Sequence, residues 1–260
     1  MARQRLGQHF LADPAWRARI VPTLSLRADD VWIEIGAGHG EMTLDLARQA
    51  RRVVAIETDT RLVEELRRRA REWRNVEIVH GDVLALDLAK LAGTRFRVYG
   101  NLPYYITSPI LHHLFRAADW IGSIHLVVQL EVAARIVAKP GRRAYGYLSV
   151  ACQFYTRPEI VLRVPPGAFR PGPKVMSALL AMRLPGERER LSIEDETEFL
   201  KFVQACFGQK RKTLRNNLRS ISSAEQVEAA LSSSNLPDQA RAEQLTLTQF
   251  AELFRRLHHS

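Results

Sequence analysis

Short apolar runs alternate with longer stretches of helical periodicity over the first 100 residues. The apolar, often β-branched runs lie at residues 31–35, 53–56, 76–80 and 96–99. Between the first three runs, residues 41–50 and 60–72 repeat apolar positions at helical spacing. Strands that alternate with helices are typical of a parallel sheet with crossover connections. The pattern therefore predicts a βαβαβ unit, the first half of a doubly wound α/β fold.

Four further apolar runs, at residues 124–129, 148–155, 160–164 and 177–183, extend the predicted sheet. The last three follow one another without clear helices between them, so we expect a mixed sheet with an antiparallel edge. Beyond Leu184, a Pro-Gly pair and a charged stretch indicate a linker, and only helical periodicity follows. We therefore expect a Rossmann-like domain over residues 1–186 and a small all-helical domain over residues 187–260.

Composition and charge narrow the class of protein. Of 260 residues, 46% are hydrophobic and 25% charged, as is ordinary for a soluble globular chain. The net charge of +10 favours a polyanionic partner such as nucleic acid, although genome composition or solubility would also explain it. Cys152 and Cys206 have neither disulfide nor zinc-ligand spacing, which favours a reducing cytoplasm. We expect neither export nor a membrane anchor, because no signal core or long apolar run is present.

Residues 34–40, Glu-Ile-Gly-Ala-Gly-His-Gly, form a glycine-rich turn after the first predicted strand. Such a turn lets a ligand lie against the backbone, although it can also occur without a ligand. Glu57 ends the next strand, 21 residues after Gly36, where its carboxylate can accept hydrogen bonds from two ribose hydroxyls. Dehydrogenases share this pattern, but Glu41 stands where a diphosphate would need glycine. A cationic, phosphate-free cofactor fits better.

The third predicted strand ends in His80-Gly-Asp82. A Gly-Asp pair is by itself a common turn. At this position, however, the Asp82 carboxylate can accept a hydrogen bond from an exocyclic adenine amine. Together with the glycines and Glu57 at the preceding strand ends, it predicts an adenosine-sized ligand across the carboxyl edge of the sheet.

The most specific motif is Asn101-Leu-Pro-Tyr104, directly after the fourth predicted strand. The N6 amine of adenine is a poor nucleophile because its lone pair is delocalised into the ring. The Asn101 side-chain oxygen and the Leu102 or Pro103 carbonyl can accept its hydrogens and favour the charge that develops on nitrogen. Tyr104 offers a ring on which an extruded base can stack. A simple β-turn is the alternative, which the position in a nucleotide-type fold disfavours.

Five segments together resemble the ribosomal RNA adenine dimethyltransferases. They are residues 7–11 (GQHFL), 34–38 (EIGAG), 101–108 (NLPYYITS), 169–175 (FRPGPKV) and 210–217 (KRKTLRNN). The last segment makes the chain more similar to the small-subunit enzymes of the kasugamycin-resistance type than to the macrolide-resistance enzymes that modify large-subunit RNA. The resemblance, which covers nearly the whole chain, implies a class I methyltransferase that uses S-adenosylmethionine and no metal.

The same resemblance implies the substrate and the site residues. The substrate would be N6 of two adjacent adenosines in the 3′-terminal hairpin loop of 16S ribosomal RNA, methylated by a monomer acting on a small-subunit precursor. The implied cofactor-binding residues are His9, Leu11, Gly36, Gly38, Glu57, Asp82 and Asn101. The implied catalytic residues are Asn101, Leu102, Pro103, Tyr104 and Phe169. Phe169 would face Tyr104 across the flipped adenine, although without the family pattern it would be interpreted as a core aromatic.

The chain departs from the family pattern at His39, Gly172 and Met176, so we expect its loops to differ in detail from those of the family. Its predicted RNA-binding residues are all basic. They are Lys210, Arg211, Lys212, Arg215 and Arg219 on a predicted helix, with Arg142, Arg143, Arg170 and Lys174 around the pocket. The helical cluster lacks an acid, so a polyanion would relieve its repulsion, whereas a solvated charged face is the alternative. A large-subunit RNA or DNA adenine methyltransferase, or an assembly factor with secondary methylation, remains open.

Overall fold

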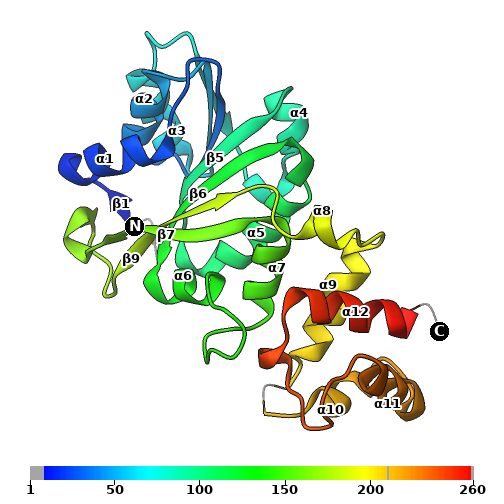
Figure 1. Ribbon diagram of the computed structural model, residues 1–260. Coiled ribbons are helices and arrows are strands. Elements are labelled where there is room, and N and C mark those ends of the chain that lie inside the picture. Colours follow the sequence, from blue (N-terminus) through cyan, green and yellow to red (C-terminus); the bar gives the residue numbers. More distant parts are fainter. Residues whose placement is uncertain (1–8, 210, 259–260) are drawn as a thin grey trace. The chain divides into compact units, whose positions relative to one another are not determined.

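The computed structural model describes residues 9–209 and 211–258, with only the backbone of Tyr104. Seven strands form one mixed sheet in the order β4-β3-β2-β5-β6-β9-β7 (Figure 1). The strands are β2 (Val31–Ile35), β3 (Arg52–Glu57), β4 (Val76–His80), β5 (Phe96–Asn101), β6 (Ile121–Gln129), β7 (Arg157–Val164) and β9 (Ser177–Arg183). Strands β2 to β6 are parallel to their neighbours, whereas β9 pairs antiparallel with β6. This confirms the predicted mixed sheet with an antiparallel edge.

The central strands are buried along their length, as expected for a parallel sheet covered on both faces. Every residue of β2 is buried, and Trp32, Phe96 and Tyr99 are among the largest fully buried side chains. The helices α2 (Glu41–Ala47) and α3 (Thr60–Arg69) connect β2 to β3 and β3 to β4, with bounds shorter than predicted. The carboxyl ends of β2, β3 and β5 therefore meet at one edge.

The prediction of a strand over residues 148–155 is wrong. This segment is the helix α7 (Tyr147–Tyr155), which follows Gly146. Seven of its nine residues are buried, so its continuous apolar run has no polar side to reveal the helical period. Ser149 accepts a hydrogen bond from Gly146 N at 3.1 Å through its hydroxyl, which supports the first turn.

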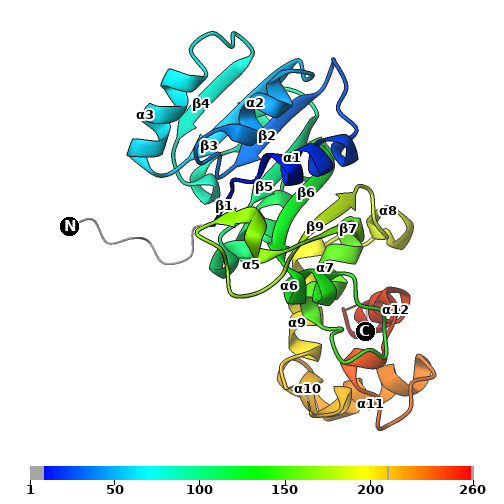
Figure 2. The ribbon, with the colours of Figure 1, turned by 90° about the vertical axis from the view of Figure 1, so that its left-hand side faces the viewer.

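A second, two-stranded sheet joins the N-terminal segment to the loop before β9. Strand β1 (Phe10–Leu11) pairs antiparallel with β8 (Phe169–Arg170), with Leu11 opposite Phe169. The Ala12 and Asp13 amides both donate to Ala168 O, at 3.1 and 3.2 Å. The segment before α1 (Pro14–Ile20) therefore lies beside the loop that leads to β9 (Figure 2).

The chain divides into two compact units. The first holds the sheet, up to Ala133 and again over Pro158–Leu184. The second holds Ala134–Arg157 and the chain from Pro185 onward, so it includes α7, which the domains predicted from the sequence place in the first. Its further helices are α8 (Arg188–Leu191), α9 (Glu196–Cys206), α10 (Leu214–Leu218), α11 (Ala224–Ser233) and α12 (Leu247–His258). Phe199 contacts Phe154 and Phe254 in its core, with ring centroids 5.1 and 5.4 Å apart.

The described part of the C-terminal region contains helices, as predicted. Among the described residues, we find no helix with the length and apolar character needed to span a bilayer.

Candidate active site

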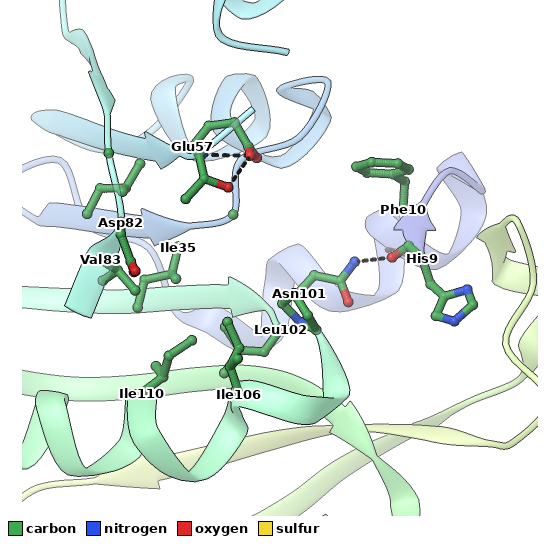
Figure 3. Close-up of a pocket in the computed structure, with 15 residues that line it drawn as sticks. His9, Phe10, Ile35, Glu57, Asp82, Val83, Asn101, Leu102, Ile106 and Ile110 are labelled. Carbon is green, nitrogen blue, oxygen red and sulfur yellow. Dashed lines mark hydrogen bonds between the residues drawn. The ribbon is translucent and has the colours of Figure 1, made fainter. Parts of the chain in front are cut away.

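A pocket opens where β2, β3 and β5 end, with about 730 Å³ of space including its open mouth (Figure 3). Its lining comes from five segments of the first unit. The lining residues are His9, Phe10, Ile35, Gly36, Ile56, Glu57, Thr58, Gly81, Asp82, Val83, Asn101, Leu102, Pro103, Ile106 and Ile110. The pocket thus lies at the edge that the sequence predicts.

Both predicted glycines have a left-handed backbone, with φ of +73° at Gly36 and +56° at Gly38, a conformation that side chains disfavour. Gly36 lines the pocket. Gly38 does not, because the Phe10 ring lies against it, and a Cβ there would come within 2.9 Å of that ring. The close approach predicted for a ligand is therefore available at Gly36, whereas Gly38 acts through Phe10 and Glu57.

Glu57 is the buried carboxylate of the site, and the neighbouring backbone holds it in place. Its Oε2 accepts from Gly38 N at 2.9 Å, and its Oε1 accepts from Thr58 N at 2.8 Å and Asp59 N at 3.0 Å. Each carboxylate oxygen can accept about two hydrogen bonds. Oε2 therefore keeps acceptor capacity toward the pocket, while the whole group fixes the glycine turn.

Asp82 lies beyond the end of β4, on the pocket side labelled in Figure 3. Its Oδ1 accepts from Leu84 N at 3.0 Å and caps the short turn Val83–Ala85. This bond fixes the side chain at the pocket rim. The second carboxylate oxygen is then the atom that can meet a ligand amine, as the sequence predicts.

Apolar side chains form the rest of the wall, and the sequence reasoning missed them. Ile35, Val83, Ile106 and Ile110 all line the pocket. Ile110 lies in α5 (Thr107–Phe115), and Ile106 ends the turn before it. Ile106 and Ile110 are four residues apart and therefore lie on one face of a helix. This spacing, directly after the Asn-Leu-Pro-Tyr motif, is the signal that could have identified them. Apolar walls with a few fixed polar groups are typical of small-molecule and cofactor sites.

Asn101 ends β5 at the inner side of the pocket. Its Nδ2 donates to the His9 carbonyl oxygen at 2.7 Å, and because a carbonyl only accepts, this contact fixes the orientation of the amide. The side-chain oxygen of Asn101 is then the acceptor left to the pocket (Figure 3).

The backbone hydrogen bonds after Asn101 distinguish Leu102 O from Pro103 O, the two carbonyls that the sequence offers as a second acceptor. Leu102 N donates to Val127 O at 3.2 Å, and Ile106 N donates to Pro103 O at 3.2 Å. Among the described backbone hydrogen bonds, Leu102 O receives none. The structure thus favours Leu102 O over Pro103 O as the second acceptor.

A smaller hollow of about 340 Å³ shares Phe10, Gly36 and Asn101 with the pocket. Glu34 lines it and accepts a hydrogen bond from the Thr43 hydroxyl. Burial raises the pKa of Glu34 to about 8, and the Thr43 hydrogen bond opposes this shift. Tyr99 also lines this hollow, and its buried hydroxyl has no hydrogen-bond partner among the described residues. The hollow therefore gives the pocket a polar extension.

Phe169 is not placed at the pocket. It is 1% exposed and packs in an apolar cluster with Leu11, Ile20 and Leu24. The pairing of β1 with β8 brings Leu11 and Phe169 opposite each other and buries both in that cluster. A stacking role would require Phe169 to leave it, so the structure corrects the predicted placement. The side chain of Tyr104 lies outside the described part.

The predicted basic residues divide between the two units. Arg170 and Lys174 are exposed in the unit that holds the pocket. Arg142 and Arg143 are exposed on a loop of the second unit, which is fixed by a 2.7 Å bond from Gly141 N to Glu243 O. Leu214 N donates to Ala240 O at 2.8 Å, so α10 and this loop converge on residues 240–245.

The prediction of one basic helix over residues 210–219 is wrong. The helix α10 spans only Leu214–Leu218, because the Thr213 side chain caps it by accepting from Asn216 N. Arg211 and Lys212 are exposed before it, Arg219 follows it, and Lys210 lies outside the described residues. Arg215 forms an ion pair with Glu228 of α11, an acid supplied from outside the segment.

The chain is similar to known proteins over nearly its whole length. The family model described as ribosomal RNA adenine dimethylase matches residues 1–259. The ribosomal RNA small subunit methyltransferase A of Koribacter versatilis is 40% identical, over 98% of this chain and 94% of that protein. Its counterpart from Xanthomonas campestris is 42% identical, over 97% and 95%.

Two solved structures cover nearly the whole chain. The 23S rRNA methyltransferase ErmE is 30% identical, with a TM-score of 0.73 over 96% of this chain and 99% of that one. A dimethyladenosine transferase from Plasmodium falciparum has a TM-score of 0.80 over 96% and 98% at 23% identity, which establishes a shared fold.

Proposed function

The chain belongs to the ribosomal RNA adenine dimethylase family, and from this membership and the pocket we propose how it acts. It is a methyltransferase that uses S-adenosylmethionine to dimethylate adenosines of small-subunit ribosomal RNA. The proposed targets are two adjacent adenosines in the 3′-terminal hairpin loop of 16S RNA. The geometry of Asn101, with its amide nitrogen bound to His9 O and its oxygen left to the pocket, carries the proposal.

The residues present fit the cofactor. Glu57 would accept hydrogen bonds from the ribose through Oε2, and Asp82 would accept one from the adenine amine. Val83 and Ile110 would contact the faces of the adenine, and Gly36 would allow the backbone approach. The hollow beside Glu34 would hold the polar methionyl end, together with Asn101. When bound, the cofactor supplies a methyl group on a sulfonium. The neutral thioether that departs from this methyl group is a good leaving group.

The protein's contribution to the reaction is alignment and electrostatics. In the first transfer, Asn101 Oδ1 and Leu102 O would each accept a hydrogen bond from the target amine and stabilise the positive charge that develops on its nitrogen. In the second transfer the amine has one N–H left, so one of the two oxygens would accept from it. Pro103, which has no N–H, would keep the turn rigid. Tyr104 would stack on the flipped base. Phe169 would support β1 from the apolar cluster instead of touching the base.

The basic residues would hold the RNA. Arg142, Arg143, Arg211 and Lys212 in the second unit are proposed to contact phosphates, since all four are exposed and extend from elements that converge on residues 240–245. Arg170 and Lys174 would do so in the first unit. We further propose that a monomer acts on a small-subunit precursor in the cytoplasm, where its two buried free cysteines would stay reduced.

The test compares three substrates: a small-subunit precursor particle, naked large-subunit RNA and duplex DNA. Mass spectrometry of oligonucleotide fragments from a ribonuclease digest should find N6,N6-dimethyladenosine at two adjacent positions in the 3′-terminal loop of the precursor and no product on the other two. Equal or greater methylation of large-subunit RNA or DNA would overturn the proposed substrate. Methylation of non-adjacent adenosines would overturn the proposed target pair.

A further inference from the structure

Large hydrophobic side chains are exposed at a few positions among the described residues. They are Tyr105, Trp120, Val175, Met176 and Ile221. Tyr105, which is 70% exposed, follows the Asn-Leu-Pro-Tyr motif after β5, whereas Val175 and Met176 precede β9. Exposed apolar side chains that gather at one place mark a binding surface.

The sheet brings these three side chains to the edge at which the pocket opens. Strand β6 lies between β5 and β9, with Asn101 opposite Val127 and Val127 opposite Leu179. Leu130 N donates to Met176 O at 2.9 Å, so Met176 lies at the carboxyl end of β6. Neighbouring strands are about 4.8 Å apart, which puts the segments before β9 and after β5 about 10 Å from each other. One unpaired base and its sugar can span this distance.

The charges beside these side chains indicate the partner. Lys174 directly precedes Val175, and both it and Arg170 of the same loop are exposed. An aromatic ring and apolar side chains next to cations are the combination that binds single-stranded nucleic acid, because bases stack while phosphates pair with the cations. A continuous RNA strand would therefore meet this surface on leaving the pocket.

We propose that Tyr105, Val175 and Met176 form a platform for the RNA base next to the adenine in the pocket, with Lys174 near the intervening phosphate. The platform rests on the proposed function and deepens it. It would hold one adenosine of the adjacent pair while the other is methylated. Neither Tyr105 nor Met176 lines the pocket, so the platform is separate from the cofactor site.

The experiment uses the full chain, saturating cofactor and reconstituted small-subunit precursors with either a normal loop or an abasic site next to the target adenosine. Single-turnover methylation is measured below saturation with RNA. On the normal loop, Tyr105→Ala and the pair Val175→Ser with Met176→Ser should each lose roughly 5- to 100-fold, as expected for one lost stacking contact. Tyr105→Phe should keep the wild-type rate. On the abasic loop, the wild type should be slow and Tyr105→Ala should lose nothing further.

Trp120→Ala is the matched control. Trp120 is 48% exposed and directly precedes β6. It therefore lies at the amino end of this strand, whereas the pocket opens at the carboxyl ends, and its loss should leave methylation unchanged. If Tyr105→Ala methylates the normal loop as fast as Trp120→Ala does, or loses as much on the abasic loop as on the normal one, the platform is refuted. Failure of the wild type to methylate the normal precursor, with cofactor binding intact, would instead overturn the proposed function and the platform with it.

Discussion

The Asn101 side chain and the His9 carbonyl, 92 residues apart, share a hydrogen bond of 2.7 Å. The His9 imidazole Nδ1 lies 2.7 Å from Pro171 O, so the same residue also contacts the loop before β9. The N-terminal segment therefore orients the Asn101 amide and connects it to the loop before β9. An asparagine is suited to this position because its nitrogen can donate to His9 while its oxygen is left to accept a hydrogen bond from a group in the pocket.

Asn101→Ala should lower the rate of methyl transfer by about 10²–10³, because one preorganised acceptor for the target amine is lost. The rate is read in single-turnover experiments at saturating cofactor, since the same side chain is proposed to hold the methionyl end. Asn216→Ala, which removes an exposed amide from α10, should leave the rate unchanged. A rate for Asn101→Ala within a few-fold of the wild type would contradict the mechanism.

Glu57→Ala should weaken S-adenosylmethionine binding by about 1–3 kcal/mol, because the ribose hydroxyls lose a charged acceptor. The structure adds a second effect: the amides of Gly38, Thr58 and Asp59 lose their acceptor, so the melting temperature should also fall. Calorimetry and thermal unfolding measure the two effects. Glu64→Ala, at an exposed position of α3, is the control, and unchanged cofactor affinity in Glu57→Ala would remove Glu57 from the site.

The sequence predicts those site residues that lie at the end of a strand or directly after it. Gly36, Glu57, Asp82 and Asn101 follow or end consecutive strands, so the topology alone brings them to one pocket, as predicted.

Contacts that depend on long-range packing were not predictable in this way. Composition alone favours a core aromatic at Phe169, and the residue is buried, but no local pattern reveals the pairing of β1 with β8 that buries it. Arg215 has its partner Glu228 on another helix. The apolar run of α7 hides its helical period because nearly all of its residues are buried.

The basic segment before α10 can be tested through salt dependence. Arg211→Ala with Lys212→Ala should weaken RNA binding and reduce the slope of log K against log salt by about 0.9 per lost contact on duplex RNA, or about 0.7 on a single strand. Arg215→Ala should have a smaller effect because Arg215 is already paired with Glu228. The matched control is Arg67→Ala with Arg68→Ala on the exposed side of α3. If the slope is unchanged in the variant with Arg211→Ala and Lys212→Ala, these two side chains are solvated and do not contact RNA phosphates.

Two buried groups give the stability of the fold opposite dependences on pH. Burial raises the pKa of Glu34 to about 8, and the charges of Glu57, Glu41 and Asp45 add to the shift. Glu34 therefore stabilises the fold fully below its unfolded pKa of 4.5, and this contribution is lost as the pH rises to about 8. Burial, with Arg97 and Arg183, lowers the pKa of His125 to about 4, so its contribution is lost as the pH falls from 6.5 to about 4.

Between pH 4.5 and 6.5 the two slopes oppose each other, so the effect of Glu34 is isolated by substitution. Glu34→Gln keeps an oxygen that can accept from the Thr43 hydroxyl but cannot ionise. Its free energy of unfolding, relative to the wild type, should rise with pH between 4.5 and 8 at up to about 1.4 kcal/mol per pH unit. Urea unfolding at several pH values measures this difference, with Glu64→Gln as an exposed control that should show no such trend. A constant difference between Glu34→Gln and the wild type across this range would mean that Glu34 is ionised in the folded protein at every pH tested.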